Sequence, residues 1–134
     1  VLIDCPPALG LLTVNALVAA RVVLVPLQCE FYALEGISHL INTVEVVRNS
    51  FNPTLYIQGI VLTMFDRRNN LSNMVANDVR AYFGDTVYKT VIPRNVRLSE
   101  APSHGCSVID YAPRAHGARH RRPAPVVRRK LFAV

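Results

Sequence analysis

Hydrophobic positions along the chain follow two alternating periods. Short uninterrupted runs of branched apolar residues are typical of strands buried on both faces, whereas apolar residues at every third or fourth position are typical of amphipathic helices. Strands are predicted at residues 1–3, 22–26, 56–65 and 87–92. Helices are predicted at residues 8–20, 33–47 and 71–83, the last one ending at Gly84. This order predicts an α/β fold in which right-handed crossovers build a parallel sheet with flanking helices.

Polar residues stand at or just after the ends of the predicted strands, namely Asp4, Gln28, Asp66 and Asn95. The carboxyl ends of parallel strands meet at one edge of the sheet, and open α/β sheets bind ligands at that edge. An Asp that follows a hydrophobic strand holds Mg²⁺ in P-loop nucleotide hydrolases, although Asp also caps turns. The shared edge favours the metal interpretation of Asp4. The sequence contains no glycine-rich phosphate loop, which is the usual companion of such an Asp.

The formal net charge of +6 is distributed unevenly. Residues 1–113 include eight basic and nine acidic residues, whereas residues 114–134 include seven basic and no acidic residues. We therefore expect one nearly neutral domain over residues 1–113 and a basic tail over residues 114–134. Pro123 and Pro125 disfavour a helix in the tail, which is interpreted as a disordered end. An electrostatic DNA tether and a short basic membrane anchor at residues 126–132 are the alternatives.

Targeting signals are absent from this sequence. No apolar run reaches the roughly 18 residues of a membrane span, and no basic segment followed by an apolar one begins the chain. Cys5, Cys29 and Cys106 are widely spaced and form no C-x-x-C pair, as is typical of free thiols in a reducing cytosol. A cytoplasmic location is expected, and a membrane partner is not. Because the chain begins with Val1 rather than Met, we expect it to belong to a longer protein.

Four segments together resemble the ParA/Soj family of chromosome- and plasmid-partitioning ATPases. They are VLIDCPPALGLLT at residues 1–13, PLQCEFYALEG at 26–36, LTMFD at 62–66 and VIPRNVRLSEAPSHG at 91–105. The resemblance extends to about Ala118 and corresponds to the carboxyl-terminal half of a family member. It implies part of a deviant P-loop NTPase fold, ATP-dependent homodimerisation of the full-length parent, a ParB-like partner, sequence-nonspecific DNA binding and association with the nucleoid.

The resemblance also implies roles for single residues. They are Asp4 for Mg²⁺, Thr63, Pro93 and Asn95 for the rim around the adenine of ATP, and Arg68 and Arg97 for DNA. The family residues that bind the phosphates and orient the attacking water have no counterpart in this chain. No catalytic residue is therefore assigned, and the chain alone is not expected to hydrolyse ATP.

Two other interpretations stay open. The chain could be a non-enzymatic module that binds DNA or contacts a ParB-like protein, because guanidinium groups on loops contact phosphates without reading bases. It could also be a nonfunctional remnant, since an uncovered sheet edge and bare apolar faces oppose folding. For the arginines themselves, the alternative is a solvated loop in which Arg67 or Arg68 forms a local ion pair with Asp66.

Overall fold

A parallel sheet of three strands forms the centre of the computed structural model, which describes residues 1–6, 8–115 and 118. Strand β1 (Val22–Gln28) pairs with β2 (Tyr56–Phe65), and β2 pairs with β3 (Val87–Pro93). The order of the strands in the sheet is therefore their order in the sequence. The predictions for these three strands are confirmed, and the bounds of β2 agree to the residue.

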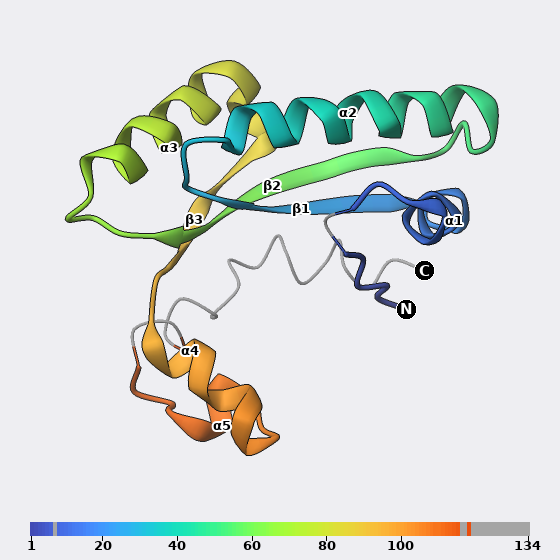
Figure 1. Cartoon of the computed structure of the whole chain (residues 1–134). Coiled ribbons are helices and arrows are strands. Elements are labelled where there is room, and N and C mark those ends of the chain that lie inside the picture. Colours follow the sequence, from blue (N-terminus) through green and yellow to red (C-terminus); the bar gives the residue numbers. More distant parts are fainter. Residues whose placement is uncertain (7, 116–117, 119–134) are drawn as a thin grey trace.

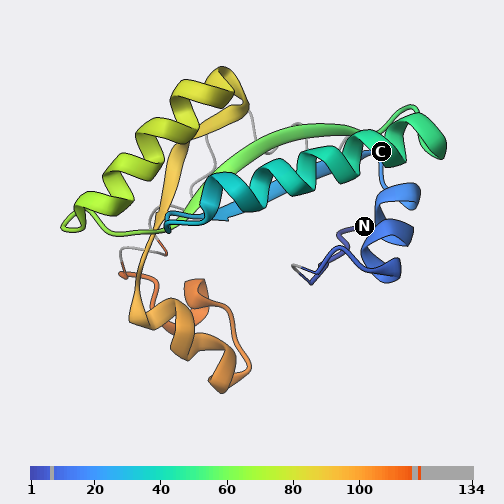
Figure 2. The same ribbon diagram turned by 45° about the horizontal axis from the view of Figure 1, so that its top comes forward.

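Helices lie on one face of this sheet (Figures 1 and 2). Helix α2 (Ala33–Ser50) connects β1 to β2, and helix α3 (Asn70–Phe83) with the short 3-10 turn η1 (Gly84–Thr86) connects β2 to β3. Helix α1 (Leu11–Ala19) lies beside the amino-terminal end of β1. The predicted α/β fold, a parallel sheet with flanking helices, is confirmed.

Local chemistry sets the bounds of α3. The side chain of Asn69 accepts a hydrogen bond from the N–H of Leu71 at 2.9 Å, which satisfies one of the free donors of the first turn. At the other end, Gly84 has φ 52° and ψ −128°, a backbone conformation that is essentially limited to glycine. The predicted stop at Gly84 is confirmed.

The main core lies between the sheet and its two covering helices. Successive side chains of a strand point to opposite faces, so every second residue of β1 points towards α2 and α3. Buried apolar side chains from all three strands and both helices meet there; they include Val25, Leu27, Ile60, Leu62, Val87, Ile37, Val75 and Val79. A smaller cluster, made of Leu17, Val44, Val47 and Leu55, joins α1 to α2.

The other face of the sheet carries apolar side chains that α2 and α3 do not cover. Leu24 of β1 is 41% exposed, and Ile92 of β3 is 36% exposed. Both alternate along their strands with residues that pack into the core. Parallel sheets are usually covered on both faces, so a sheet that the described helices cover on one face is an unusual arrangement.

The predicted first strand at residues 1–3 is wrong for this structure. The segment is irregular, and Val1, Leu2 and Ile3 are 120%, 88% and 54% exposed. A strand is held by ladder hydrogen bonds to a neighbour and by burial of its side chains, and an apolar run supplies only the second requirement. Among the described residues no strand pairs with this segment, so the described sheet has three strands rather than the predicted four.

A small helical unit follows β3 and extends beyond its carboxyl end (Figure 1). It consists of α4 (Val96–Glu100), the 3-10 turn η2 (Ala101–His104) and α5 (Val108–Tyr111). Ala101 and Val108 are buried within it, and the rings of His104 and Tyr111 stack with centroids 4.7 Å apart. Within the described part of the chain, no helix is long and apolar enough to cross a membrane.

Candidate functional site

The carboxyl ends of the three strands meet at one edge of the sheet. Gln28 of β1 lies opposite Thr63 of β2, and Phe65 of β2 lies opposite Pro93 of β3. Beyond the last pair, the N–H of Arg94 donates to the carbonyl oxygen of Phe65 at 3.0 Å, which ties the loop after β3 to the end of β2. The predicted edge is therefore present for β1, β2 and β3, and a backbone hydrogen bond connects the ends of β2 and β3.

The backbone at this edge departs from regular strand geometry. Met64 has φ 53°, the one positive φ of a residue other than glycine in the described segments. The β2–β3 register also shifts between Leu62 and Phe65. Positive φ is strained for a residue with a side chain, and register irregularities re-aim side chains at the rims of sheets. Both features occur immediately before the residues that form the candidate site.

A hollow of about 400 Å³ lies between the ends of β2 and β3. Its lining residues are Phe65, Asp66, Arg67, Arg68, Val91, Pro93 and Arg94. Three arginines and a single acidic residue thus line the hollow together with three apolar residues. One oxygen of the acidic side chain, Oδ1 of Asp66, accepts a hydrogen bond from the backbone N–H of Arg68 at 2.9 Å, and the local turn takes its shape from this bond.

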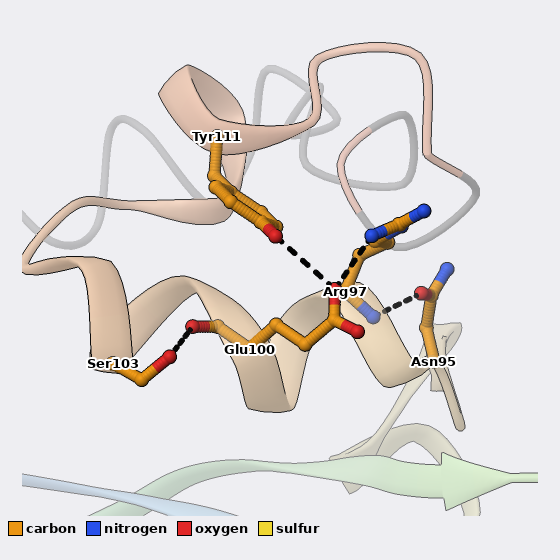
Figure 3. A network of polar contacts seen from close by, with 5 residues as sticks. All are labelled: Asn95, Arg97, Glu100, Ser103 and Tyr111. Carbon is orange, nitrogen blue, oxygen red and sulfur yellow. Dashed lines mark hydrogen bonds and ion pairs between the residues drawn. The ribbon is translucent and has the colours of Figure 1, made fainter.

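Arg97 lies outside this hollow, in the first turn of α4. Its guanidinium donates to Oε2 of Glu100 at 2.7 Å (Figure 3). The hydroxyl of Tyr111 donates to the same carboxylate oxygen at 3.3 Å. Hydrogen bonding and charge attraction from Glu100 raise the pKa of Arg97, which keeps the guanidinium charged.

Asn95 begins α4 as its cap. Its side-chain oxygen accepts from the N–H of Arg97 at 2.9 Å, so the amide is engaged in shaping the helix start (Figure 3). Thr63 lies one position before the strained Met64, and its carbonyl oxygen accepts from the N–H of Cys29 at 3.1 Å. Of the three residues predicted for the adenine rim, Pro93 lines the hollow, while Thr63 and Asn95 lie close to it along the chain without lining it. Their nucleotide-binding role stays a prediction.

Asp4 is not brought to this edge. It is exposed in the irregular amino-terminal segment, which lies beside α1, while the hollow is at the opposite end of β1 (Figures 1 and 2). No group of three or more His, Cys, Asp and Glu side chains that could hold a metal ion occurs within the described part of the chain. The residues present therefore do not fit a Mg²⁺ site by themselves, and the metal role of Asp4 stays a prediction.

The two arginines predicted for DNA have different surroundings. Arg68 lines the hollow, whereas Arg97 is held by Glu100. The ion pairs formed by described residues are Arg97 with Glu100 and Arg48 with Glu45, so the alternative pairing of Asp66 with Arg67 or Arg68 is absent from that part of the structure.

Sequence reasoning did not single out Arg67 and Arg94 as site residues. Each follows a strand end directly, Arg67 by two positions after β2 and Arg94 by one after β3. That position was the signal that could have found them, because residues just past the carboxyl ends of neighbouring parallel strands meet in space. The basic tail at 114–134 was also noted, but residues 116–117 and 119–134 lie outside the described residues.

Comparisons with known proteins place these features in a family. A family model described as an AAA domain matches residues 1–57. The chromosome partitioning protein ParA of Caulobacter vibrioides is 64% identical over 119 residues, which are 89% of this chain and 45% of that protein. The sporulation initiation inhibitor protein Soj of Bacillus subtilis is 60% identical over 118 residues, 88% of this chain and 47% of that protein.

Solved structures agree on the fold. A crystal structure of cobyrinic acid a,c-diamide synthase from Mycobacterium smegmatis matches with a TM-score of 0.72 and 33% identity over 97% of this chain and 46% of that one. The same enzyme with bound ADP and magnesium matches with a TM-score of 0.61 and 41% identity over 69% of this chain and 38% of that one. Structures of this kind have a P-loop NTPase-like fold.

The alignments are long relative to this chain and short relative to its relatives. The chain spans less than half the length of the ParA and Soj proteins that it matches. Identity of 60% or more over nearly nine tenths of the chain nevertheless leaves no ambiguity about ancestry, and the motifs at the strand ends lie within the aligned length. The chain belongs to the ParA/Soj family of chromosome-partitioning proteins, and it corresponds to a part of a family member.

Proposed function

We propose that the chain is the DNA-contacting part of a ParA-type partition ATPase, acting in the segregation of a chromosome or plasmid. The observation that carries the proposal is the placement of Arg68, an arginine that matches the family pattern, in a positively charged hollow at the carboxyl edge of the sheet. Guanidinium groups on loops bind phosphate oxygens without reading base sequence, which suits a protein that moves over DNA of any sequence.

The proposal also includes a nucleotide site at the same edge of the sheet. Pro93 lines the hollow, and Thr63 and Asn95 lie close to it along the chain; following the family resemblance, these three residues would form part of the rim around the adenine of ATP. Mg²⁺ would be held by Asp4 only if the amino-terminal segment paired as a strand beside further sheet, because the described residues form no group of three or more side chains that could hold a metal ion. ATP hydrolysis is accordingly assigned to a longer family member, and this chain alone is not expected to catalyse it.

Partners follow from the same family membership. We assign ATP-dependent homodimerisation and contact with a ParB-like protein to the longer family member, in a cytoplasmic, nucleoid-associated setting. Dimerisation would double the number of arginine contacts to DNA, which would make DNA affinity depend on nucleotide state. The boundary between a domain at 1–113 and a basic tail at 114–134 is part of this proposal.

A direct test is fluorescence anisotropy of a labelled DNA duplex titrated with the full chain at several salt concentrations. We expect binding that weakens steeply as salt rises, because phosphate contacts release counterions. Arg68→Glu with Arg97→Glu should abolish the binding that arises from the body of the protein. Unchanged binding by this double variant would reject the body as the DNA surface and leave the tail.

Two controls separate the alternative functions. A chain ending at Pro113 removes the seven basic residues of the tail, so binding that survives in it belongs to the body. Thermal unfolding followed by circular dichroism tests the remnant hypothesis, because a cooperative transition requires a packed core. A non-enzymatic DNA-binding module is the second candidate, and it is favoured by the observation that the arginines, unlike the phosphate-binding loop, are all present in this chain.

A further inference from the structure

Two aromatic side chains project into solvent just after the carboxyl end of β1. Phe31 and Tyr32 lie in the loop that joins β1 to α2 (Figure 1), and they are 70% and 73% exposed. Their ring centroids are 5.1 Å apart, at an interplanar angle of 87°. The rings of such an edge-to-face pair cover little of each other, so most of their apolar surface is available to a partner. Neither residue lines the hollow between β2 and β3.

The loop that carries the two rings is anchored to its neighbours. The N–H of Cys29 donates to the carbonyl oxygen of Thr63 at 3.1 Å, and the carbonyl oxygen of Cys29 accepts from the hydroxyl of Ser72 at 3.4 Å. The N–H of Ala33 donates to the carbonyl oxygen of Glu30 at 3.0 Å, which closes the turn between them. Aromatic side chains on a fixed backbone lose little conformational freedom on binding.

Tyr32 stands at a position where another residue type would stabilise the helix better. It is the N-cap of α2, and its side chain makes no capping hydrogen bond. Ser, Thr, Asp and Asn are preferred at an N-cap, because their side-chain oxygen accepts from a free N–H of the first turn. A residue that breaks a local rule without a local gain is expected where a function requires it. The stability of α2 therefore does not account for an exposed tyrosine here.

The surface around the rings is acidic. Glu30 and Glu35 flank the rings in the sequence, both are exposed, and neither takes part in the ion pairs that described residues form. No lysine or arginine occurs in residues 22–47, although the chain as a whole has a net charge of +6. The phosphates of DNA would be repelled by these carboxylates. A twofold contact with a second copy is also disfavoured, because each copy would bring the same negative charges to the contact.

A peptide that contains arginine has the complementary chemistry. Guanidinium groups stack on aromatic faces and form paired hydrogen bonds with carboxylates. Aliphatic side chains of the same peptide would cover the ring edges and Leu34, which is 37% exposed in the first turn of α2. Aromatic residues at the centre of a contact with charges around them are typical of surfaces that bind other proteins.

We propose that the exposed pair Phe31 and Tyr32, flanked by two glutamates, is a docking surface for a basic, arginine-containing peptide segment of a partner protein. The rings supply the apolar contact, and Glu30 and Glu35 select a positively charged peptide. The inference goes beyond the proposed function and depends on neither DNA binding nor nucleotide binding.

The test is fluorescence anisotropy of a short labelled peptide of alternating arginine and leucine, titrated with the full chain. We expect saturable binding that weakens as salt rises, because salt screens the charge pairs. A peptide in which glutamate replaces arginine should bind at least about tenfold more weakly. No binding of the arginine peptide, or equal binding of the two peptides, would overturn the proposal.

The variant Tyr32→Ser separates binding from folding. Serine supplies the capping oxygen that tyrosine lacks, so the thermal midpoint should equal or exceed that of the unaltered chain. Loss of the ring should weaken binding of the arginine peptide at least about tenfold, as is usual for an aromatic residue that anchors a contact. Phe51→Ala is the matched control, because Phe51 is 65% exposed at the other end of α2. Unaltered binding by Tyr32→Ser, or an equal loss in Phe51→Ala, would reject the aromatic pair as the site.

Charge reversal tests the two glutamates through a gain that misfolding does not produce. Glu30→Lys with Glu35→Lys should bind the glutamate peptide more tightly than the arginine peptide, which reverses the preference of the unaltered chain. Glu45→Lys with Asp78→Lys changes the net charge equally at exposed positions of α2 and α3, and it should keep the original preference. A preference for the arginine peptide that persists in the first double variant would overturn the proposal.

Other occupants of the surface give different results. If a chain ending at Pro113 binds the arginine peptide and the full chain does not, the basic tail of the chain occupies the surface and an external partner is rejected. If sedimentation velocity shows a dimer that Tyr32→Ser dissociates, the occupant is a second copy, and the proposal is likewise overturned. These mixtures contain no DNA and no nucleotide, so failure of the docking surface would leave the proposed function untouched.

Discussion

Arg97 and Glu100 face each other across one turn of α4, with the guanidinium donating to Oε2 at 2.7 Å. The same carboxylate oxygen accepts from Tyr111, and the carbonyl oxygen of Glu100 accepts from the hydroxyl of Ser103 at 2.7 Å (Figure 3). Glu100 therefore links α4 to the turn η2 and to α5. An arginine predicted to contact DNA is held by a carboxylate that would repel the same DNA.

This relationship predicts that Glu100 limits the contribution of Arg97 to DNA binding. Glu100→Gln removes the negative charge while keeping an oxygen that accepts from Arg97 and Tyr111. We expect tighter DNA binding and a salt slope steeper by up to about 0.9, as for one added phosphate contact. Fluorescence anisotropy across a salt series measures both quantities.

Glu45→Gln is the control for general charge effects. Glu45 forms the other described ion pair of the chain, with Arg48 at 3.8 Å in α2. Both variants raise the net charge by one, so a purely global effect would make them equal. An equal gain in the two variants, or no gain for Glu100→Gln, would show that Glu100 does not restrain Arg97.

The sequence predicted the elements that local pattern alone determines. The largely apolar segment 56–65 predicted both bounds of β2 correctly, and Gly84 marked the end of α3 because no other residue adopts its backbone conformation readily. The run at 1–3 looked equally clear but forms no strand. Its apolar residues are suited to burial but stay exposed here, because the ladder hydrogen bonds of a strand need a neighbour that a single segment cannot specify.

The same distinction, between what a local pattern determines and what depends on a second segment, applies to the site. The prediction that Gln28, Asp66 and Asn95 stand at or just after strand ends at one edge is confirmed for β1, β2 and β3, because parallel topology brings strand ends together, whereas Asp4 does not reach that edge. Arg67 and Arg94 line one hollow because both directly follow ends of neighbouring parallel strands, a signal that was present in the sequence and was not used. The pairing of Arg97 with Glu100 follows from helical i, i+3 spacing, but the short helix at 96–100 was not predicted, so its pair was missed as well.

Asn52 joins the loop after α2 to the end of α1. Its Nδ2 lies 3.2 Å from Leu17 O, 3.0 Å from Val18 O and 2.6 Å from Ala20 O. These carbonyls belong to the last turn of α1 and the residue after it, where helices leave carbonyl oxygens without helical partners. One side chain thus satisfies a helix end that lies more than thirty residues away in the sequence.

Asn52→Leu should therefore lower the free energy of unfolding by about 1–3 kcal/mol, the usual cost of leaving partly buried polar groups unpaired. Asn52→Asp should cost at least as much, because a carboxylate would face three carbonyl oxygens. Urea denaturation followed by circular dichroism measures the change. Asn49→Leu, an exposed position on α2, is the matched control; equal losses at positions 49 and 52 would contradict the capping role.

Gly59 allows Tyr88 to pack across β2. A Cβ placed on Gly59 would lie 2.5 Å from Cε2 of Tyr88 and 3.1 Å from the backbone oxygen of Thr86. Real carbon atoms do not approach so closely, so a side chain at this position must displace the tyrosine ring. The close approach explains why a glycine stands within this strand.

Gly59→Ala should destabilise the chain by about 1–3 kcal/mol through overpacking. Tyr88→Ala removes the clashing ring, and so the loss caused by Gly59→Ala should be smaller in a Tyr88→Ala background, with a coupling energy of about 0.5 kcal/mol or more. Urea denaturation of the four chains of this cycle supplies the numbers. Additive losses would show that the backbone contact with Thr86, rather than the tyrosine ring, excludes a side chain.

Cys29 is a buried thiol directly after β1, 3% exposed, and burial raises its pKa while the positive charge of Arg80 opposes the shift more weakly. The folded chain therefore holds the thiol proton more strongly than the unfolded chain does. The corresponding stability is fully present below the ordinary thiol pKa of about 8.5 and is lost as the pH rises through the higher folded value. The free energy of unfolding should accordingly decline with rising pH above about 8.5, and Cys29→Ala should make that decline smaller.

Thiol labelling supplies the site-specific measurement. With iodoacetamide at about pH 8, Cys29 should react at least about tenfold more slowly than Cys106, which is only half-buried, because the thiolate is the reactive form and a buried thiol must first be exposed by local opening. Mass spectrometry of the digested protein reads the two sites in one sample, and labelling in urea restores equal rates if folding is the cause. Equal labelling of Cys29 and Cys106 in the folded chain would show that the segment joining β1 to α2 does not bury this thiol in solution.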